Sequence, residues 1–316
     1  MDQRERSGDR ELRTTGDRLL DWRELVERCG RKPTKKRVHA LRVATLRIQA
    51  EVEDELSEVP RASHEAQAMV RFGKLAEKLR DALGSVRELD VWIGKLEGLR
   101  ESLSGSAPYV PRSSRETSRQ LERLERRLTK KRERAGTKLV GAIEKRRDDL
   151  MAAAHDVQKA TGGRVNEGDG EQQAPKLLKE FAGIVAEFPV FDEENLHEFR
   201  KRIKKIRYVA EIHSVNSVCG RIAEQMKTAQ AAIGEWHDWQ VLARIASDGK
   251  HAKDADALEL LSSLASEAFE TAVATCHGVL QRMGDLGQQV EGGSGSMRKG
   301  PGRSESMMTV AARKLA

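Results

Sequence analysis

The sequence has 316 residues, enough for one large domain or two, with a sizeable core. Lysine and arginine number 57 against 50 aspartates and glutamates, a net charge of +7, and this modest excess favours a local basic site over a wholly cationic protein. Aromatic residues make up only 4%, and no apolar run of membrane-spanning length occurs. The composition predicts an all-α protein without a membrane span.

Amphipathic helices are expected through the first half, after a disordered start at residues 1–16. They are predicted over Asp17–Cys29, from Pro33 through His39, and over His64–Leu83, Val86–Leu103 and Arg115–Ala160. Gly84 is expected to end the third of them, and Glu88 to cap the next. A loop is expected over Ser104–Ser114, which contains two prolines.

The second half follows a Gly-rich polar stretch, which we interpret as a flexible linker at 161–174. Helices are predicted over Pro175–Glu187, Asp192–Val215, Val218–Ile233, His237–Ala246 and Ala252–Asp285. Asp238 is interpreted as a cap or turn residue. The predicted domain therefore covers 17–286, with halves at about 17–160 and 175–286. A Gly/Ser-rich basic tail at 287–316 is expected to be disordered.

One pattern occurs in both halves: a branched aliphatic residue, histidine, two further residues and arginine, at Val38–Arg42 and Leu196–Arg200. On a helix, residues three, four and seven apart share a face. In each copy the apolar residues then form one stripe, and the histidine and arginine lie beside it among cations. The repeat predicts that two helices present the same chemistry.

The second copy opens a run in which six of the eight residues from Arg200 to Arg207 are cationic and none is acidic. Arg115–Arg134, by contrast, mixes both signs at spacings that permit intrahelical pairs, and we interpret it as a plain exposed helix. The run at Arg200–Arg207 has no such partners close by in the sequence. It is expected to bind an anion, although a solvated surface is the alternative.

Further motifs resemble the conserved histidine α-helical domain (CHAD) family. Leu83–Val91 and Ile233–Val241 are similar to that family's Leu-Gly-x-x-Arg-Asp-x-Asp-Val segment, and Leu196–Glu211 is similar to its histidine helix. The four blocks occur in the expected order within residues 17–286. The resemblance implies a helical bundle of two pseudo-symmetric four-helix halves around a basic central channel that binds inorganic polyphosphate.

The resemblance and the cationic faces together give a set of candidate ligands. The predicted polyphosphate-binding residues are Lys35, His39, Arg42, Arg47, Lys74, Lys78, His197, Arg200, Lys201, Lys204, Lys205 and Arg207. Two positions depart from the family: Leu46 and Gln49 replace frequent arginines, so the first half is expected to grip phosphate less tightly.

Other functions fit the residues less well. His39 and His197 have cations as helical neighbours, which disfavours a metal or a general base, so neither metal nor cofactor is expected. Trp236 and Trp239 are interpreted as core residues and not as base-stacking platforms. No acidic Glu-x-Glu-x-Lys strand or phosphate loop occurs, so a binding protein is favoured over a triphosphate hydrolase.

The expected surroundings follow from the same features. Three widely spaced cysteines, Cys29, Cys219 and Cys276, indicate a reducing compartment, and the charged N-terminus lacks a secretory signal, so a cytoplasmic protein is expected. Polyphosphate or polyhydroxyalkanoate granules and their proteins are further candidate partners. A granule scaffold and a general nucleic-acid-binding protein remain alternatives, although no nucleic-acid signature is present and no specific nucleic acid is expected.

Overall fold

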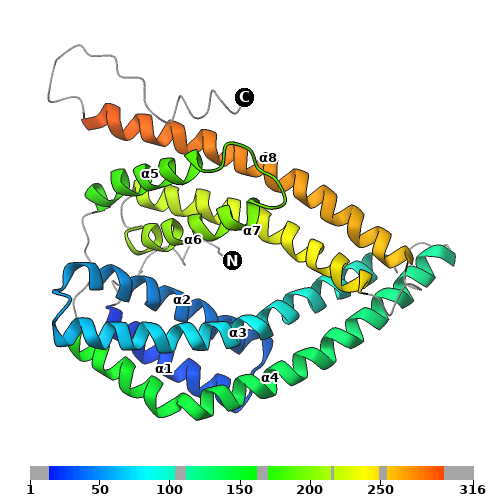
Figure 1. The fold of residues 1–316 in the computed structure, drawn as a ribbon, viewed down its shortest axis with the longest axis horizontal. Helices are drawn as coiled ribbons and strands as arrows, with labels where there is room; N and C mark the ends of the chain where they lie inside the picture. The colour runs from blue at the N-terminus through cyan, green and yellow to red at the C-terminus, as the bar shows by residue number, and fades with distance from the viewer. Residues whose placement is uncertain (1–13, 104–111, 162–169, 215–216, 249–254, 295–316) are drawn as a thin grey trace, which may run out of the picture. The chain divides into compact units, whose positions relative to one another are not determined.

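The computed structural model describes residues 14–103, 112–161, 170–214, 217–248 and 255–294, and within these ranges it contains helices and no strand (Figure 1). The all-α prediction is confirmed. The helices are α1 (Thr15–Arg31), α2 (Lys35–Glu58), α3 (His64–Leu103), α4 (Arg112–Thr161), α5 (Gly170–Ala186), α6 (Leu196–Ile212), α7 (Ser217–Ser247) and α8 (Ala255–Ser294). None of these described helices is long and apolar enough to cross a membrane.

The chain folds as two compact units. The described residues of Met1–Leu99 and Glu125–Asn166 form unit 1, and those of Arg100–Leu124 and Glu167–Ala316 form unit 2. Residues 100–124, which the sequence assigned to the first half, therefore group with unit 2. There the side chain of Gln120 on α4 accepts a 2.9 Å hydrogen bond from the backbone N–H of Ala257 on α8. The bounds of the two pseudo-symmetric halves stay predictions.

Unit 1 has a core formed by α1–α3 and the second part of α4. Trp22 and Phe72 are fully buried and meet edge to face, with ring centroids 5.3 Å apart. The indole N–H of Trp22 donates to the hydroxyl of Thr45 at 2.9 Å, and that hydroxyl donates to the carbonyl of Leu41. The polar atoms of Trp22 and Thr45 are thus satisfied within a largely apolar interior.

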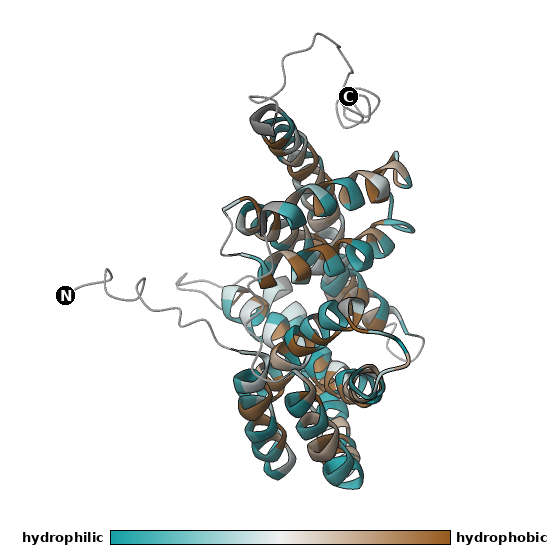
Figure 2. Ribbon diagram, turned by 90° about the vertical axis from the view of Figure 1, so that its left-hand side faces the viewer, coloured by the Kyte–Doolittle hydropathy of each residue, from teal (hydrophilic) through white to brown (hydrophobic). Residues whose placement is uncertain are grey.

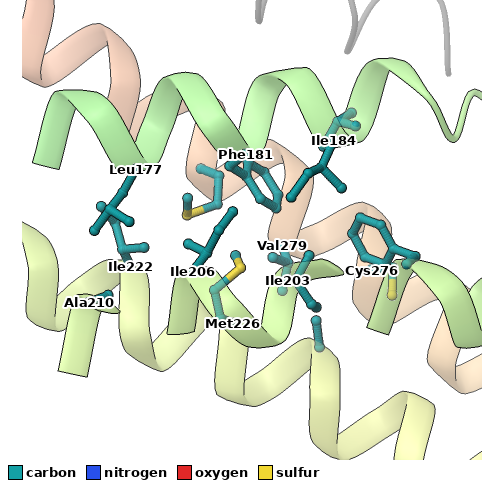
Figure 3. Packing of buried hydrophobic residues seen from close by; sticks show 14 of the residues in the cluster. Leu177, Phe181, Ile184, Ile203, Ile206, Ala210, Ile222, Met226, Cys276 and Val279 are labelled. Atoms are coloured by element: carbon teal, nitrogen blue, oxygen red, sulfur yellow. The ribbon is translucent and has the colours of Figure 1, made fainter. Parts of the chain in front are cut away.

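Unit 2 has a second core between α5, α6, α7 and α8 (Figure 3). Phe181 comes from α5, Ile203 and Ile206 from α6, Met226 from α7 and Val279 from α8, and all are nearly inaccessible to solvent. The apolar stripe predicted for the histidine helix is therefore the buried face of α6. Polar and apolar residues are both present on each helix, as Figure 2 shows, which is the pattern of amphipathic helices packed on a core.

Several predicted helix ends were wrong. Helices α3 and α7 continue through Gly84 and Gly234, so Glu88 and Asp238 lie inside helices and not at helix ends. The apolar pattern continues across Gly84, because Leu83 and Val86 on either side are both fully buried. Packing of those side chains outweighs the cost of about 1 kcal/mol that glycine carries in a helix.

Helices also occupy parts of the segments expected to be disordered. Helix α5 begins at Gly170, inside the predicted linker, and α8 runs on to Ser294, inside the predicted tail. Ala174 and Leu286 are buried and Val290 packs against the core of unit 2, so apolar contacts extend both helices. Residues 1–13, 162–169 and 295–316 of the predicted disordered segments, and most of the predicted loop at 104–114, lie outside the described residues.

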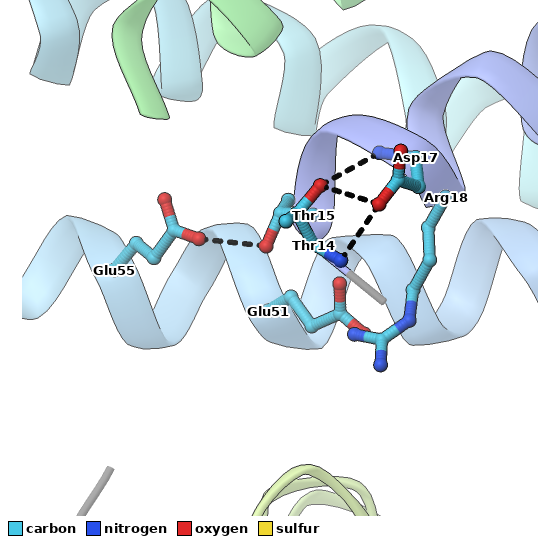
Figure 4. A network of polar contacts seen from close by, with 6 residues as sticks. All are labelled: Thr14, Thr15, Asp17, Arg18, Glu51 and Glu55. Atoms are coloured by element: carbon cyan, nitrogen blue, oxygen red, sulfur yellow. Dashed lines mark hydrogen bonds and ion pairs between the residues drawn. The ribbon is translucent and has the colours of Figure 1, made fainter. Parts of the chain in front are cut away.

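Helix α1 is attached to α2 by a polar network (Figure 4). Thr14 and Asp17 form a capping box at the start of α1. Arg18 contacts the carboxylate of Glu51 at 2.5 Å, and the hydroxyl of Thr15 donates to Glu55 at 2.8 Å. Burial raises the pKa of Glu51 to about 6, against the opposing effect of Arg18. A buried carboxylate on α2 is thereby held beside its cationic partner.

Candidate functional site

The arginine of each His-x-x-Arg repeat lies against a glycine of the next helix. The Nη1 atom of Arg42 donates to the carbonyl oxygen of Arg80 at 3.2 Å, and a Cβ atom built on Gly84 would lie only 3.1 Å from the same Nη1. A larger residue than glycine would displace the guanidinium. Gly84 therefore makes room for the side chain of Arg42. This accounts for the glycine of the Leu-Gly motif, which does not end a helix here.

Unit 2 repeats this contact. The Nε atom of Arg200 donates to the carbonyl oxygen of Gln230 at 3.4 Å, and a Cβ atom on Gly234 would lie 3.4 Å from its Nη2. The accepting carbonyl belongs in both units to the residue four positions before the glycine. Burial lowers the pKa of Arg200, and the negative charge of Asp238 partly opposes this effect. Asp238, inside α7, thus helps to stabilise a half-buried cation.

The two histidines differ in their neighbours. In unit 2 the rings of His197 and His237 stack, with centroids 4.8 Å apart and an interplanar angle of 26°. Nδ1 of His197 is buried and has no hydrogen-bond partner among the described residues. Burial, followed by the nearby His237, Lys201 and Arg200, lowers the pKa of His197. Burial also lowers the pKa of His237, together with Arg200 and Arg244.

His39 on α2 has a cationic neighbour in place of a second histidine. Its pKa is lowered by partial burial and by the charges of Arg87 and Arg42. Arg87 lies three residues after Gly84, as His237 lies three residues after Gly234. Each repeat histidine therefore has as its neighbour the basic residue that follows the glycine by three positions. His39 and His197 both favour the neutral form when no anion is bound.

The cationic run on α6 has acidic partners that the sequence reasoning missed. Lys201 pairs with Glu198 at 3.2 Å, and Arg202 makes two contacts of 2.8 and 3.0 Å with Glu187. Arg207 pairs with Glu211 at 2.8 Å. Glu198 and Glu211 lie one helical turn away, a spacing at which side chains meet. The expectation of an uncompensated run was wrong for these three residues.

Two basic residues of α6, Lys204 and Arg207, lie beside the ring of Tyr208. Arg207 is 5.3 Å and Lys204 is 6.0 Å from the centroid of its ring. Arg207 also donates from Nη1 to the side-chain oxygen of Gln230 at 3.0 Å. Lys205 is exposed, and Lys204 is half-buried. The structure therefore groups Lys204 and Arg207 on α6 with Gln230 of α7.

In unit 1 the predicted lysines spread over α2 and α3. Arg47, Lys74 and Lys78 are exposed, and Lys74 lines a depression of about 250 Å³ together with Gln49 and Arg80. Lys35 approaches α3, because a Cβ atom on Gly94 would lie 3.1 Å from its Nζ. Arg80 was not predicted from the sequence. Its place four residues before Gly84 is the signal that identifies it.

A second missed residue positions the start of α2. Arg132, on the segment interpreted as a plain exposed helix, contacts buried Asp90 at 2.9 Å and donates to the carbonyl of Pro33 at 2.6 Å. Asp90 belongs to the Leu83–Val91 motif. Through Arg132 it fixes the turn before α2, which begins after an N-cap at Thr34 and not at Pro33.

Two features of the described residues concern metal binding and thiol chemistry. Among them, no group of three histidine, cysteine, aspartate or glutamate residues is arranged to bind a metal. The three cysteines are buried thiols that form no disulfide, and burial raises the pKa of Cys29 to about 11 and that of Cys276 to about 12. Thiols with such pKa values are not nucleophiles at neutral pH.

Comparison with known proteins gives a family and a fold. The sequence model of the CHAD-domain family matches residues 11–247, more than half of the chain. A solved structure, PptA from Streptomyces chartreusis, shares the fold with a TM-score of 0.55 and 17% identity, over 88% of this chain and 99% of that one. A search of curated proteins found no match.

Polyphosphate binding is a known property of CHAD domains, which generally bind and do not catalyse, so a polyphosphate-binding role is supported for this chain at the level of the family. The motifs at Leu83–Val91, Leu196–Glu211 and Ile233–Val241 lie within the matched range. The chain belongs to the CHAD-domain family.

Proposed function

We propose that this protein binds inorganic polyphosphate without hydrolysing it, through the basic residues of α2 and α3 in unit 1 and of α6 and α7 in unit 2. The observation that carries the proposal is the repeated arrangement of histidine, arginine and glycine. In both units an arginine is held on a backbone carbonyl beside a glycine, with a repeat histidine one turn before it. Family membership supplies the ligand class.

The carbonyl contacts explain how these arginines could bind phosphate strongly. A guanidinium has five N–H donors in a rigid fork, and a donor fixed on a carbonyl orients the others. Arg42 and Arg200 therefore lose little conformational entropy when an anion arrives. Their partial burial also lowers the local dielectric, which strengthens a charge-assisted hydrogen bond.

The histidines add a component that depends on the ligand. Burial and, after it, nearby basic residues lower the pKa of His39 and His197 in the free protein. A phosphate group placed among those cations would favour the protonated ring, which would then donate a hydrogen bond. The buried Nδ1 of His197 is a nitrogen that could take up such a proton. Binding of the anion is thus coupled to protonation.

The repeating charge of polyphosphate suits several such contacts at once. Each unit of the chain carries about one negative charge, so successive units can reach successive cations, and longer chains gain contacts without a new association cost. Release of counterions makes the affinity strongly dependent on salt. Location in the cytoplasm and association with polyphosphate or polyhydroxyalkanoate granules stay predictions.

Titration of the purified protein with long-chain polyphosphate tests the proposal. Replacing Lys204 and Arg207 together by alanine should weaken binding about 100-fold or more at low salt, since each charge-assisted contact contributes about 1.5 to 3 kcal/mol. The matched control is Arg202→Ala with Lys227→Ala, which removes the same charge from the same unit. Arg202 and Lys227 are exposed and paired with Glu187 and Glu224, so the control should change affinity less than about threefold.

Competition with RNA at equal phosphate concentration distinguishes polyphosphate binding from general nucleic-acid binding. Polyphosphate should remain bound at physiological salt when RNA or duplex DNA is added. Displacement by nucleic acid at an equal or lower concentration would replace our proposal by general nucleic-acid binding. A folded Lys204/Arg207 variant that binds like the unmodified protein would show that α6 is not the site.

A further inference from the structure

Each unit has a hydrogen bond between an arginine and a glutamine on two neighbouring helices, and the two residues are swapped between the helices of unit 1 and those of unit 2. In unit 1, Nη1 of Arg80 on α3 donates to the side-chain oxygen of Gln49 on α2 at 3.5 Å. In unit 2, Nη1 of Arg207 on α6 donates to the side-chain oxygen of Gln230 on α7 at 3.0 Å. The histidine helix thus supplies the glutamine in one unit and the arginine in the other.

The positions correspond residue by residue. Gln49 follows His39 by ten residues, as Arg207 follows His197 by ten. Arg80 precedes Gly84 by four residues, as Gln230 precedes Gly234 by four. The carbonyls of Arg80 and Gln230 are also the ones that accept the bonds from the repeat arginines. The exchange therefore occurs at one defined place of the interface.

Burial shows which part of each pair faces solvent. Gln49 and Gln230 are 6% and 7% exposed, whereas the side chains of Arg80 and Arg207 are 31% and 24% exposed. In both units a buried amide oxygen holds one donor of a guanidinium whose other side reaches solvent. The guanidinium charge therefore lies beside a buried glutamine in both units, although it comes from α3 in unit 1 and from the histidine helix α6 in unit 2.

We propose that Arg80 is a phosphate-binding residue of unit 1, where it takes the role of Arg207 in unit 2; this rests on the proposed function. The sequence of α2 alone, with Gln49 in place of a cation, indicates a weaker first half. The contact with Arg80 supplies the missing guanidinium from α3.

The acidic surroundings of Arg80 are looser than those of Arg207. Glu77 and Asp81 lie 3.5 and 3.8 Å from Arg80, whereas Glu211 lies 2.8 Å from Arg207. Lys74 lines the same depression as Arg80, together with Glu53 and Glu77. Each ion pair that an arriving phosphate displaces at Arg80 is therefore weaker than the pair of Arg207 with Glu211.

The test uses the full chain and moves the charge back to the histidine helix. Arg80→Gln should weaken binding of long-chain polyphosphate about 10-fold or more. The exchange Arg80→Gln with Gln49→Arg places the guanidinium as in unit 2 and should restore affinity to within about threefold. Arg147→Gln removes an exposed arginine paired with Glu27 on the α1–α4 side of unit 1 and should have little effect.

The possible failures are distinguishable. If the unmodified protein does not bind polyphosphate, the proposed function fails first. If Lys204/Arg207 variants lose affinity while a folded Arg80→Gln protein does not, the function stands and the role of Arg80 is overturned. An exchange variant that is as stable as Arg80→Gln but no tighter would also overturn it. Should Arg80→Gln unfold, Arg80→Lys keeps the charge without the fork, and an affinity equal to that of the unmodified protein would count against a guanidinium contact.

Discussion

His197 and His237 stack on one another at 4.8 Å, and Nδ1 of His197 is buried without a hydrogen-bond partner among the described residues. The pKa of both rings is lowered, first by burial and then by neighbouring cations and, for His197, by the second ring. Two rings with lowered pKa values are neutral at pH 7.5. An anion bound beside them would favour their protonated forms.

We therefore predict that polyphosphate affinity increases as the pH falls. The bound state has the higher histidine pKa and takes up protons, so the dissociation constant decreases as the pH falls through that value, by up to about tenfold per pH unit for each proton. Titration at constant ionic strength between pH 8 and 5.5 measures this, with long chains whose terminal groups are few. Replacing His197 and His237 by glutamine should reduce the slope of the profile and leave the part due to His39, and replacing exposed His155 should leave the slope unchanged. An affinity independent of pH in the unmodified protein would contradict the coupling.

The glycines that face the repeat arginines are predicted to differ in their tolerance of alanine. Alanine gains about 1 kcal/mol of helix propensity over glycine. At Gly234 the new Cβ would lie 3.4 Å from Arg200, a normal contact, so the free energy of unfolding should rise. At Gly84 the distance is 3.1 Å, so the Arg42 guanidinium must shift by a few tenths of an ångström, which weakens its bond to the Arg80 carbonyl and should offset the gain.

Chemical denaturation of both variants measures this difference, which should be about 1 kcal/mol. Gly98→Ala is the reference, because nothing lies within 4 Å of a Cβ there and α3 gains the propensity alone. Equal stabilisation of Gly84→Ala and Gly98→Ala would show that Arg42 is not held against Gly84.

Glu51 should destabilise the protein in its ionised form. Its pKa rises from 4.5 to about 6 on folding, so the unfolded chain holds the negative charge more easily than the folded one. The stability this residue costs at pH 7.5, about 2 kcal/mol, is recovered as the pH falls from about 6 to about 4.5. Glu51→Gln resembles the protonated residue and should be more stable than the unmodified protein at pH 7.5 and about equal at pH 4.5. A difference in unfolding free energy that does not change with pH would contradict this.

Incubation with tripolyphosphate, ATP or polyphosphate and Mg²⁺ or Mn²⁺ should release no phosphate above background. The prediction rests on the sequence, which has no acidic Glu-x-Glu-x-Lys strand and no phosphate loop to hold a metal-bound triphosphate. Released phosphate is measured across the fractions of the last purification step. Turnover that follows the protein peak and survives a further column would overturn it.

The sequence alone determined the fold class and the two repeats. Strong helical periodicity and few strand formers predicted the all-α chain, and the buried stripe of α6 is the one that spacing predicted. Trp236 was correctly assigned to the core, whereas Trp239, assigned with it, is only half-buried and donates its indole N–H to Glu235. These features are local: each depends on residues within a few turns of one another, which the sequence displays directly.

Helix ends and pairings were decided only by tertiary structure. Gly84 and Gly234 have the local chemistry of helix ends, yet the buried residues on either side of each glycine keep α3 and α7 continuous. The sequence did not identify Arg80 as the counterpart of Arg207, because Arg80 and Gln49 lie on different helices and are 31 residues apart in the sequence. Contacts between distant segments depend on packing of several helices at once, which no pattern within a single helix records.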